Sequence, residues 1–519
     1  MDYENLKPKN ANLLDRILNA IEKTGNKMPD SITLFLLLSF FLLILSAIGS
    51  VFHWNAIHPG TGETMTVLNL FSKEGFRMIW GKAISNFTSF PPFGMVLVAV
   101  IGSSVAEKSG FLTSLMRKTI LGIPHSMVTF TLIFVSINAN MIGDAGFILI
   151  PPLAATIYLS IGRSPILGLL IAFACISAGF SANLSIGLLD VTTYSYTESA
   201  AKLMDPNYLA SPAINWLFLF ISCFLLSLLG TVLVEKVLVK RYPVTKKQLS
   251  DWSEGVSIEN LTPVQNKALL LAGISALLYV IIVVLLCLGD DPFFGDPNVL
   301  SNKLLSAESP MMKGIIPTIT LLFLIPSVVY GIVCGKYRSD KDIYQDIIEG
   351  FKEMAQYIFL CFFIAQFINY FSWSNIGPIL AIKGSNFLNS LHFTGIPLLL
   401  GLMFISSLLN LIIGSASSKW AILAPIFIPM MMIIGFDPAV TQLVYRIGDS
   451  LSNPLSPLSP YFPVLIGFAK KYDKNAGIGT MIAKVIPFSV VFTIIWIIQL
   501  FIWIVFNLPL GPGGGIYLP

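Results

Sequence analysis

The sequence predicts an all-α polytopic membrane protein, with nine transmembrane helices, two opposed re-entrant hairpins and two inverted structural repeats. Three observations predict this class. Hydrophobic residues make up 55% of the 519 residues and charged residues only 12%, whereas a soluble chain has about 25% charged residues. Several uncharged runs exceed the roughly 18 residues that cross a bilayer. Glycines, prolines and polar residues interrupt some of these runs.

The predicted spans follow the apolar runs along the chain. They are 31–53, 88–107, 166–188, 213–237, 268–287, 314–335, 355–372, 439–465 and 481–507. Two further apolar stretches, 127–161 and 396–435, have polar, glycine-containing middles. Such backbone is tolerated at membrane depth only where protein buries it or where it lines a cavity. The first stretch is also shorter than the roughly 40 residues that two full spans need. Re-entrant hairpins therefore fit both stretches best.

Loop charges orient the chain, because Lys and Arg concentrate in cytoplasmic loops. The N-terminal tail and the loops near Lys240, Arg338 and Lys471 are basic, and the loop near Asp291 is acidic. The predicted order is a cytoplasmic tail (1–30), a first membrane half (31–238, hairpin 127–161, broken helix 166–190), a cytoplasmic linker (239–266), a second half (267–508, hairpin 396–435, broken helix 439–465) and an external C-terminal tail (509–519).

An internal repeat relates the two halves. Gly122-Ile123-Pro124 recurs as Gly395-Ile396-Pro397, at an offset of 273 residues, and further prolines and glycines keep that register. In each half, a polar-tipped hairpin precedes a span that polar residues interrupt. The predicted topology inserts the two hairpins from opposite sides. Inverted repeats with broken helices are typical of secondary transporters, which bind substrate where the breaks meet.

The second interruption reads YRIGDSLSNPLSP, residues 445–457, and we expect a helix break over 446–457. Pro454 and Pro457 remove backbone donors and disfavour helix before themselves, and Gly448 is expected to loosen the turn. The freed carbonyls, with the side chains of Ser452 and Asn453, would offer uncharged oxygens to a small cation. The first interruption, SAGFSANLSIGLLD, ends at Asp190.

Four asparagines and three aspartates are the candidates for coupling transport to a cation. Two asparagines fall at the breaks of each half, and they are the candidate Na⁺ ligands: Asn140, Asn183, Asn410 and Asn453. Asp190 could carry a proton or bind a cation, or it could simply cap a helix. Asp144 lies at the first hairpin tip. Asp449 is best explained as the partner of a nearby cation, and Arg446 is the neighbour in sequence.

Cations and aromatic residues in the second half are the candidates for binding an anion. Arg446 can grip a carboxylate bidentately, although it could instead neutralise Asp449 and hold the break open. Lys419 could meet an anion or extend to the interface. Trp420 could stack on an aromatic ring or anchor the interface.

The sequence contains few features that are typical of an enzyme. The five cysteines lie singly in apolar runs, and the four histidines show no metal-ligand spacing. The sequence has neither a nucleotide-binding glycine pattern nor a nucleophile elbow. We therefore expect a protein that is not an enzyme, has no cofactor beyond a coupling Na⁺ or H⁺, and does not bind nucleic acid. A channel would also line a pore with polar residues, but the inverted repeat favours a carrier.

Three segments resemble the AbgT family of p-aminobenzoyl-glutamate transporters: LNLIIGSASSKWAILAPIFIPM, YRIGDSLSNPLSPLSPYF and GFSANLSIGLLD. The resemblance extends along nearly the whole chain. It implies a homodimer in the bacterial inner membrane, with nine spans and two opposed hairpins, within the superfamily that includes sodium–dicarboxylate carriers. By position, it implies functional roles for Asp190, Ser417, Trp420, Pro438 and Arg446. The family often has Thr where this chain has Ser452, which keeps the hydroxyl.

The resemblance also implies a substrate. Family members import p-aminobenzoyl-glutamate by cation symport, and some export sulfonamide antimetabolites and so confer antibiotic resistance. The expected function is thus cation-coupled transport of a small aromatic carboxylate by alternating access. A sodium-coupled dicarboxylate symporter of the same superfamily is the alternative.

Overall fold

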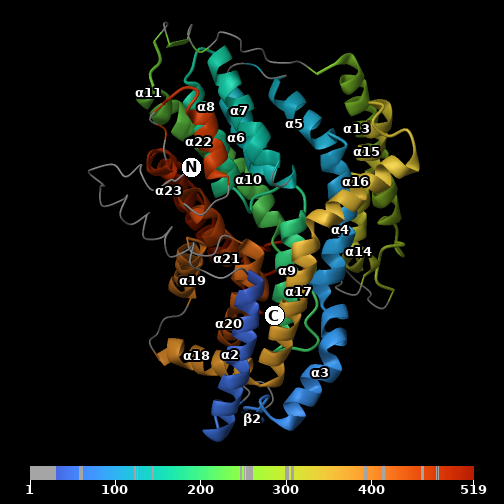
Figure 1. The fold of residues 1–519 in the computed structure, drawn as a ribbon, viewed down its shortest axis with the longest axis vertical. Coiled ribbons are helices and arrows are strands. Elements are labelled where there is room, and N and C mark those ends of the chain that lie inside the picture. The colour runs from blue at the N-terminus through green and yellow to red at the C-terminus, as the bar shows by residue number, and fades with distance from the viewer. Residues whose placement is uncertain are drawn as a thin grey trace, which may run out of the picture.

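The fold is known from a computed structural model (Figure 1), which describes most of the chain. The described residues are 31–57, 62–121, 124, 127–142, 145–245, 248–249, 252, 261–297, 303–304, 309–390, 395–411, 415–456, 461–474, 476 and 478–518. The predicted N-terminal tail, residues 1–30, lies outside them, as does part of the predicted linker.

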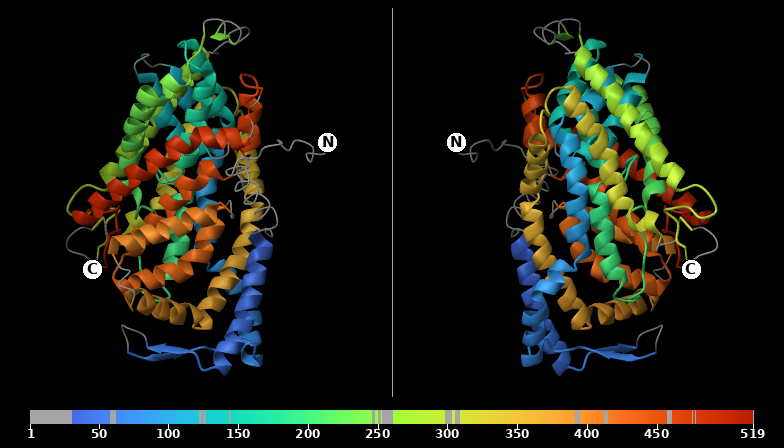
Figure 2. Two further views of the ribbon diagram at one scale, coloured as in Figure 1. Left: turned by 90° about the vertical axis from the view of Figure 1, so that its left-hand side faces the viewer. Right: turned by 90° about the vertical axis from the view of Figure 1, so that its right-hand side faces the viewer.

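The described chain is helical almost throughout. The first half contains α2 (Ser31–Val51), α3 (Lys73–Thr88), α4 (Pro91–Lys108), α5 (Phe111–Leu121), α6 (Val128–Ile137), η3 (Asn138–Ile142), α7 (Ala145–Ser160), α8 (Pro165–Ala178), α9 (Leu188–Ala201), α10 (Trp216–Leu233), η4 (Val234–Leu238) and α11 (Val239–Arg241). The second half contains α13 (Pro263–Leu286), α14 (Pro310–Lys313), α15 (Ile315–Val333), α16 (Asp340–Glu353), α17 (Ala355–Trp373), α18 (Ile376–Ser390), α19 (Gly395–Asn410), α20 (Ala416–Ile434), α21 (Pro438–Ser452), η5 (Asn453–Leu455), α22 (Phe462–Ala469) and α23 (Ile478–Val505). Strands β1 (Asn55–Ile57) and β2 (Thr64–Thr66) form a small antiparallel hairpin at one end of the molecule (Figure 2).

Seven of the described helices are long and apolar enough to cross a membrane. Six of them match predicted spans, since they contain α2, α4, α10, α13, α15 and α23. The seventh is α20, which belongs to the second predicted hairpin. The helices of the other three predicted spans are shorter or less apolar, so the count of nine spans stays a prediction.

The two predicted hairpins are helical pairs, and each packs against the helix that follows it. In the first half, α6 and α7 form the pair, and α7 packs along α8. In the second half, α19 and α20 form the pair, and α19 packs along α21. α6 has only 10 residues, which is too short to cross a bilayer. Whether the hairpins re-enter the membrane stays a prediction.

The helix of the first half is interrupted where the sequence places its polar residues. α8 ends at Ala178, α9 begins at Leu188, and irregular backbone joins them. Helix α9 then packs against α20 of the opposite half, and α21 contacts both α8 and α9. The broken segments of the two halves are therefore brought together in the buried centre of the molecule.

The predicted position of the second break is wrong. Helix α21 is continuous and buried from Pro438 to Ser452, so Arg446 and Asp449 lie within regular helix. The helix ends only at Asn453 and Pro454, where a 3₁₀ turn begins. A proline lacks the N–H that the next helical bond needs, and it disfavours helix at the preceding residue. The proline therefore acts locally, and the break follows the charged residues instead of containing them.

Gly448 does not loosen α21, as the sequence had suggested, but lets it pack closely. A Cβ added there would lie 2.3 Å from the carbonyl oxygen of Met403 and 2.8 Å from Cβ of Ser406, both in α19. The absence of a side chain thus allows the backbones of hairpin and helix to touch.

The C-terminal tail folds back onto the second half. Asp437 and Leu518 donate backbone hydrogen bonds to Ile516 and Gly435 respectively, each at 3.0 Å. Leu510 and Ile516 are buried. The tail therefore covers the connection between α20 and α21.

Candidate functional site

A buried ion pair joins the two halves. Arg446 on α21 donates from Nη1 to Oδ1 of Asp190 on α9 at 2.6 Å, and both side chains are almost completely inaccessible. The other carboxylate oxygen of Asp190 accepts from the Gly187 amide at 2.7 Å and from Asn183 Nδ2 at 2.9 Å. Asp190 therefore caps the N-terminus of α9 and also neutralises a guanidinium. Its proposed role in carrying a proton or a cation stays a prediction.

Two serines join the halves beside this pair. Ser450 on α21 and Ser181 in the first break lie 2.8 Å apart through their hydroxyl oxygens, and the Ser181 amide donates to Ser450 Oγ at 3.1 Å. Arg446 Nη2 donates to the Ser181 carbonyl at 3.3 Å. These contacts fix the backbone of the first break on the helix of the second half.

A second buried ion pair corrects the predicted partner of Asp449. Its carboxylate accepts from Nζ of Lys419 on α20, and not from Arg446. Lys419 also donates to Oδ1 of Asn410, the last residue of α19. Residues three positions apart on one helix seemed the natural pair, but helix packing gives each charge a partner from another element.

Asn410 gathers polar groups from the end of α21. Its Nδ2 donates to the Asp449 carbonyl at 2.9 Å, to Ser452 Oγ at 3.0 Å and to Asn453 Oδ1 at 2.8 Å. The structure therefore brings together four of the predicted coupling residues of the second half. They are joined by Lys419, which the sequence had suggested as a contact for an anion.

In the first half, Asn140 and Asn183 both hold the segment that contains the first break. Asn140 Nδ2 donates to the carbonyls of Phe180 at 2.7 Å and Ile137 at 3.0 Å, and Asn183 donates to Asp190. The Oδ1 atoms of Asn140 and Asn183 are buried, and neither has a hydrogen-bond partner among the described residues. Two amide oxygens that lack donors are suitable ligands for a small cation.

Trp420 is completely buried. Its ring stacks on Tyr445 with centroids 4.4 Å apart and an angle of 19° between the planes. Its Nε1 donates to Thr197 Oγ1 at 2.8 Å, and Thr197 donates to Gln442 at 2.6 Å. In this conformation Tyr445 covers one face of the Trp420 ring, which was expected to stack on a substrate.

Two other predicted residues lie on the same helices, at some distance from the ion pairs. Ser417 is half-buried in the first turn of α20. Pro438 is the first residue of α21, two turns before Arg446. Asp144, predicted at the first hairpin tip, lies outside the described residues.

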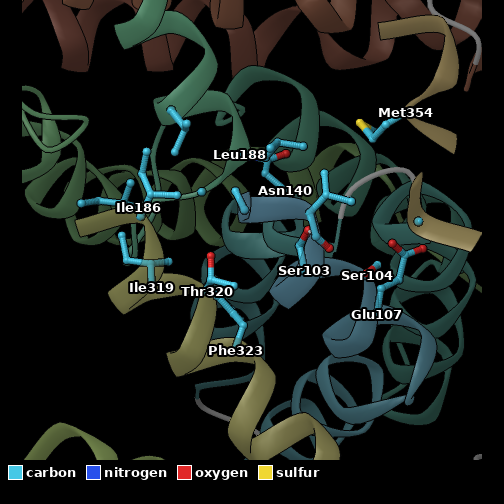
Figure 3. A pocket seen from close by; sticks show the side chains of 16 residues that line it. Ser103, Ser104, Glu107, Asn140, Ile186, Leu188, Ile319, Thr320, Phe323 and Met354 are labelled. Atoms are coloured by element: carbon cyan, nitrogen blue, oxygen red, sulfur yellow. The ribbon is translucent and has the colours of Figure 1, made fainter. Parts of the chain in front are cut away.

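A cavity of about 540 Å³ lies next to the first break (Figure 3). Ser103, Ser104 and Glu107 of α4 face it, as do Ile319, Thr320 and Phe323 of α15. Asn140, Gly187 and Leu188 complete the side nearest α9. Gly187 lines the cavity, and its amide donates a hydrogen bond to Asp190. A single hydrogen bond therefore links the wall of the cavity to the buried ion pair. Its volume lies within the range that suits small-molecule ligands.

Sequence reasoning missed several of these residues. Thr197, Gln442 and Asn215 form a buried hydrogen-bonded chain, in which Gln442 donates to Asn215 at 2.7 Å. A glutamine in an apolar span is a signal that could have identified one of them. The serines of α4 gave no signal, because single serines in apolar helices usually bond their own backbone.

These features define a class of protein. Paired hairpins, an interrupted helix in each half and charges buried where the halves meet are the architecture of a membrane transporter. The chain belongs to the AbgT putative transporter family, whose family model matches residues 16–518. The prediction of a transporter rather than an enzyme is thus confirmed.

Relatives and solved structures agree with this assignment. The p-aminobenzoyl-glutamate transport protein of Escherichia coli (strain K12) is 35% identical over 495 residues, which cover 95% of each chain. The YdaH transporter of Alcanivorax borkumensis is 34% identical, with a TM-score of 0.87 over 93% of this chain and 100% of its own. MtrF of Neisseria gonorrhoeae, described among antimetabolite efflux pumps, is 34% identical, with a TM-score of 0.88 over 96% of this chain and 100% of its own.

Proposed function

We propose that this protein is a cation-coupled secondary transporter of p-aminobenzoyl-glutamate or related small aromatic anions, and that it also exports sulfonamides. It would work by alternating access, as a homodimer in the bacterial inner membrane, with its N-terminus cytoplasmic and its C-terminus external. The similarity to the Escherichia coli transport protein supports the substrate. The similarity to MtrF supports the export of antimetabolites.

The observation that carries the proposal is the position of the cavity beside the Asp190–Arg446 pair. An aromatic anion needs an apolar chamber for its ring and a cation for its carboxylate. Apolar side chains of α4, α9 and α15 line much of the chamber. Asp190 connects Arg446 to this chamber, because one of its carboxylate oxygens accepts from Arg446 and the other from the amide of Gly187, which lines the chamber.

Coupling follows from competition for Arg446. While Asp190 is ionised, it neutralises the guanidinium. Protonation of Asp190, or binding of Na⁺ to it with Asn140 and Asn183, would weaken that bond and free Arg446 for the carboxylate of the substrate. A buried charge without a partner costs several kcal/mol, so substrate and cation would be favoured together. The coupling is the same whether the cation or the substrate binds first.

The test is uptake of labelled p-aminobenzoyl-glutamate into proteoliposomes, with Na⁺ and pH gradients imposed separately. We expect saturable uptake above equilibrium under at least one gradient, as well as counterflow of unlabelled substrate. Labelled succinate separates the alternative, because a dicarboxylate symporter would accumulate succinate under the Na⁺ gradient and would not accumulate the aromatic substrate. Flux that never saturates and shows no counterflow would indicate a channel and overturn the proposal.

A further inference from the structure

An apolar groove with a lysine at one end lies between α10 and α23. Its volume is about 530 Å³, and Lys236 of η4 is among the residues that line it. The apolar side chains of its two walls are Leu225, Leu229 and Val232 from α10, and Ile494, Ile498 and Ile502 from α23. Most of these side chains are at least 40% exposed, so the groove opens on the outer surface of the molecule.

Buried hydrogen bonds hold the two walls of the groove together. Gln499 of α23 donates from Nε2 to the Phe218 carbonyl of α10 at 3.0 Å, and its Oε1 accepts from Ser222 Oγ at 2.9 Å. Trp496 Nε1 donates to the same Ser222 hydroxyl at 3.0 Å. These bonds need no ligand, so the groove is a preformed feature and an occupant does not have to separate the helices.

The groove has the length and depth of one lipid acyl chain. Along α10 and η4 its lining extends from Leu225 to Val237, which is about 18 Å at the rise of 1.5 Å per residue. The apolar span that contains α10 runs from Trp216 to Arg241, so the groove lies mostly in the half of the span that ends at Arg241. One leaflet contributes about 15 Å of hydrocarbon, half of the roughly 30 Å core. The groove therefore matches the acyl layer of a single leaflet.

The end of the groove at Lys236 carries uncompensated positive charge. Lys236 is exposed, as are Lys240 and Arg241 of the adjoining α11, and none of the three forms an ion pair within the part of the chain that the structure describes. Glu235 is the one carboxylate of η4 and α11. Two hydrogen bonds, of 2.6 and 2.8 Å, hold it on the Arg163 guanidinium. This carboxylate is therefore already neutralised and leaves the charge of Lys236 to an occupant of the groove.

A second copy of the chain suits this surface less well than a lipid. In a two-fold dimer the same patch contributes from both copies. Membrane-inserted copies have a common orientation, so the basic ends of the two patches would meet there. Lys236, Lys240 and Arg241 of one copy would then face the same cations of the other. An anionic lipid instead supplies the missing negative charge.

We propose that the groove binds one anionic phospholipid per chain, with an acyl chain along α10 and α23 and the phosphate at Lys236. A lysine stem can lie along apolar surface while its ammonium reaches the head-group layer. Basic pockets between membrane helices bind anionic head groups in this way. The groove contains neither member of the Asp190–Arg446 pair and none of the residues of the cavity beside it. The proposal therefore does not depend on the transported substrate.

The test is native mass spectrometry of the purified protein, titrated with phosphatidylglycerol or with phosphatidylcholine of the same acyl chains. We expect one phosphatidylglycerol per chain to bind at least fivefold more tightly than phosphatidylcholine. Lys236→Met should weaken phosphatidylglycerol by about fivefold, since a basic residue near a lipid head group contributes about 1 kcal/mol, and should leave phosphatidylcholine unchanged. Lys236→Arg should keep the preference. Lys267→Met, at an exposed lysine in the first turn of α13, is the control for loss of any surface cation.

A second variant fills the groove and leaves its charge intact. Leu229→Trp places a large side chain in the groove and should weaken both lipids. Leu228→Trp is the matched control, because Leu228 is the neighbouring residue on α10, is 56% exposed and does not line the groove. Either of two results overturns the proposal: equal affinity of wild type for the two lipids, or an unchanged preference in Lys236→Met. Loss of the dimer in Leu229→Trp but not in Leu228→Trp would also overturn it, by identifying the groove as a contact between copies.

Discussion

Arg446 and Asp190 form one charged unit shared by the two halves. With both side chains buried, removal of one leaves the other without a partner, which destabilises a protein by about 3–5 kcal/mol. Arg446→Gln and Asp190→Asn should therefore each lower the stability measured by thermal unfolding in detergent. The double variant should recover most of the loss, because both charges are gone, yet it should not transport.

Two outcomes would contradict this account of the pair. A double variant no more stable than the single variants would show that the two charges are not energetically coupled. A well-folded double variant with wild-type accumulation of substrate would show that Arg446 only holds the helices together. The matched control is Arg163→Gln, which breaks a half-exposed pair with Glu235 and should cost far less.

Asp437 gives a pH dependence of known sign. It lies in the connection between α20 and α21, and it accepts from the Ala439 amide at 2.7 Å. Burial raises the pKa of its carboxyl to about 6, above the roughly 3.9 of an unfolded chain. The folded state therefore holds more protons between these values, so the contribution of Asp437 to stability falls as pH rises through that window.

Asp437→Asn removes the titration and keeps an oxygen for the Ala439 amide. We expect the variant to gain stability relative to wild type as pH rises from 5 to 7, by about 1–2 kcal/mol on the scale of 1.36 kcal/mol per pKa unit. Unfolding midpoints across this range provide the measurement. Asp342→Asn is the control, because backbone amides lower the pKa of that exposed carboxyl. A difference between wild type and Asp437→Asn that does not change with pH would refute the assignment.

At the scale of elements, the contact between α19 and α21 depends on Gly448. A Cβ there would lie 2.3 Å from a backbone oxygen, which a rotamer change cannot relieve. Gly448→Ala should therefore destabilise the protein by about 1–3 kcal/mol, as overpacking does. Gly273→Ala in α13 is the control, since nothing lies within 4 Å of its added Cβ. It should be neutral or stabilising by up to about 1 kcal/mol; equal losses in both variants would exclude close packing as the cause.

The elements were far easier to predict from the sequence than their partners. Long apolar runs and short polar interruptions are local signals, so six of the predicted spans and both helical pairs could be located. The end of α21 was misplaced because polar residues were taken to interrupt a helix, whereas buried charges are compatible with helix when other elements neutralise them. Arg446 and Asp190 are 256 positions apart, and only the packing of α9 on α21 brings them together.

At the scale of the whole molecule, the Asp190–Arg446 pair is the one ion pair among the described residues whose two members come from different halves. The Lys419–Asp449 pair lies entirely within the second half. The two halves therefore differ in the placement of their buried charges.

The orientation of the chain in the membrane is predicted from the charges of its loops. The end of α11 carries Lys240 and Arg241, whereas the loop after α13 carries Asp290 and Asp291. The positive-inside tendency places the first group in the cytoplasm. In a cysteine-free background, single cysteines at the exposed positions Asp291 and Gly513 should react with an impermeant maleimide added to intact cells, and a cysteine at Arg241 should react only after permeabilisation. Labelling at Arg241 in intact cells would reverse the orientation. Protection of Asp291 together with labelling at Gly513 would leave the orientation intact but break the predicted number of crossings, because the connection after α13 would then lie inside.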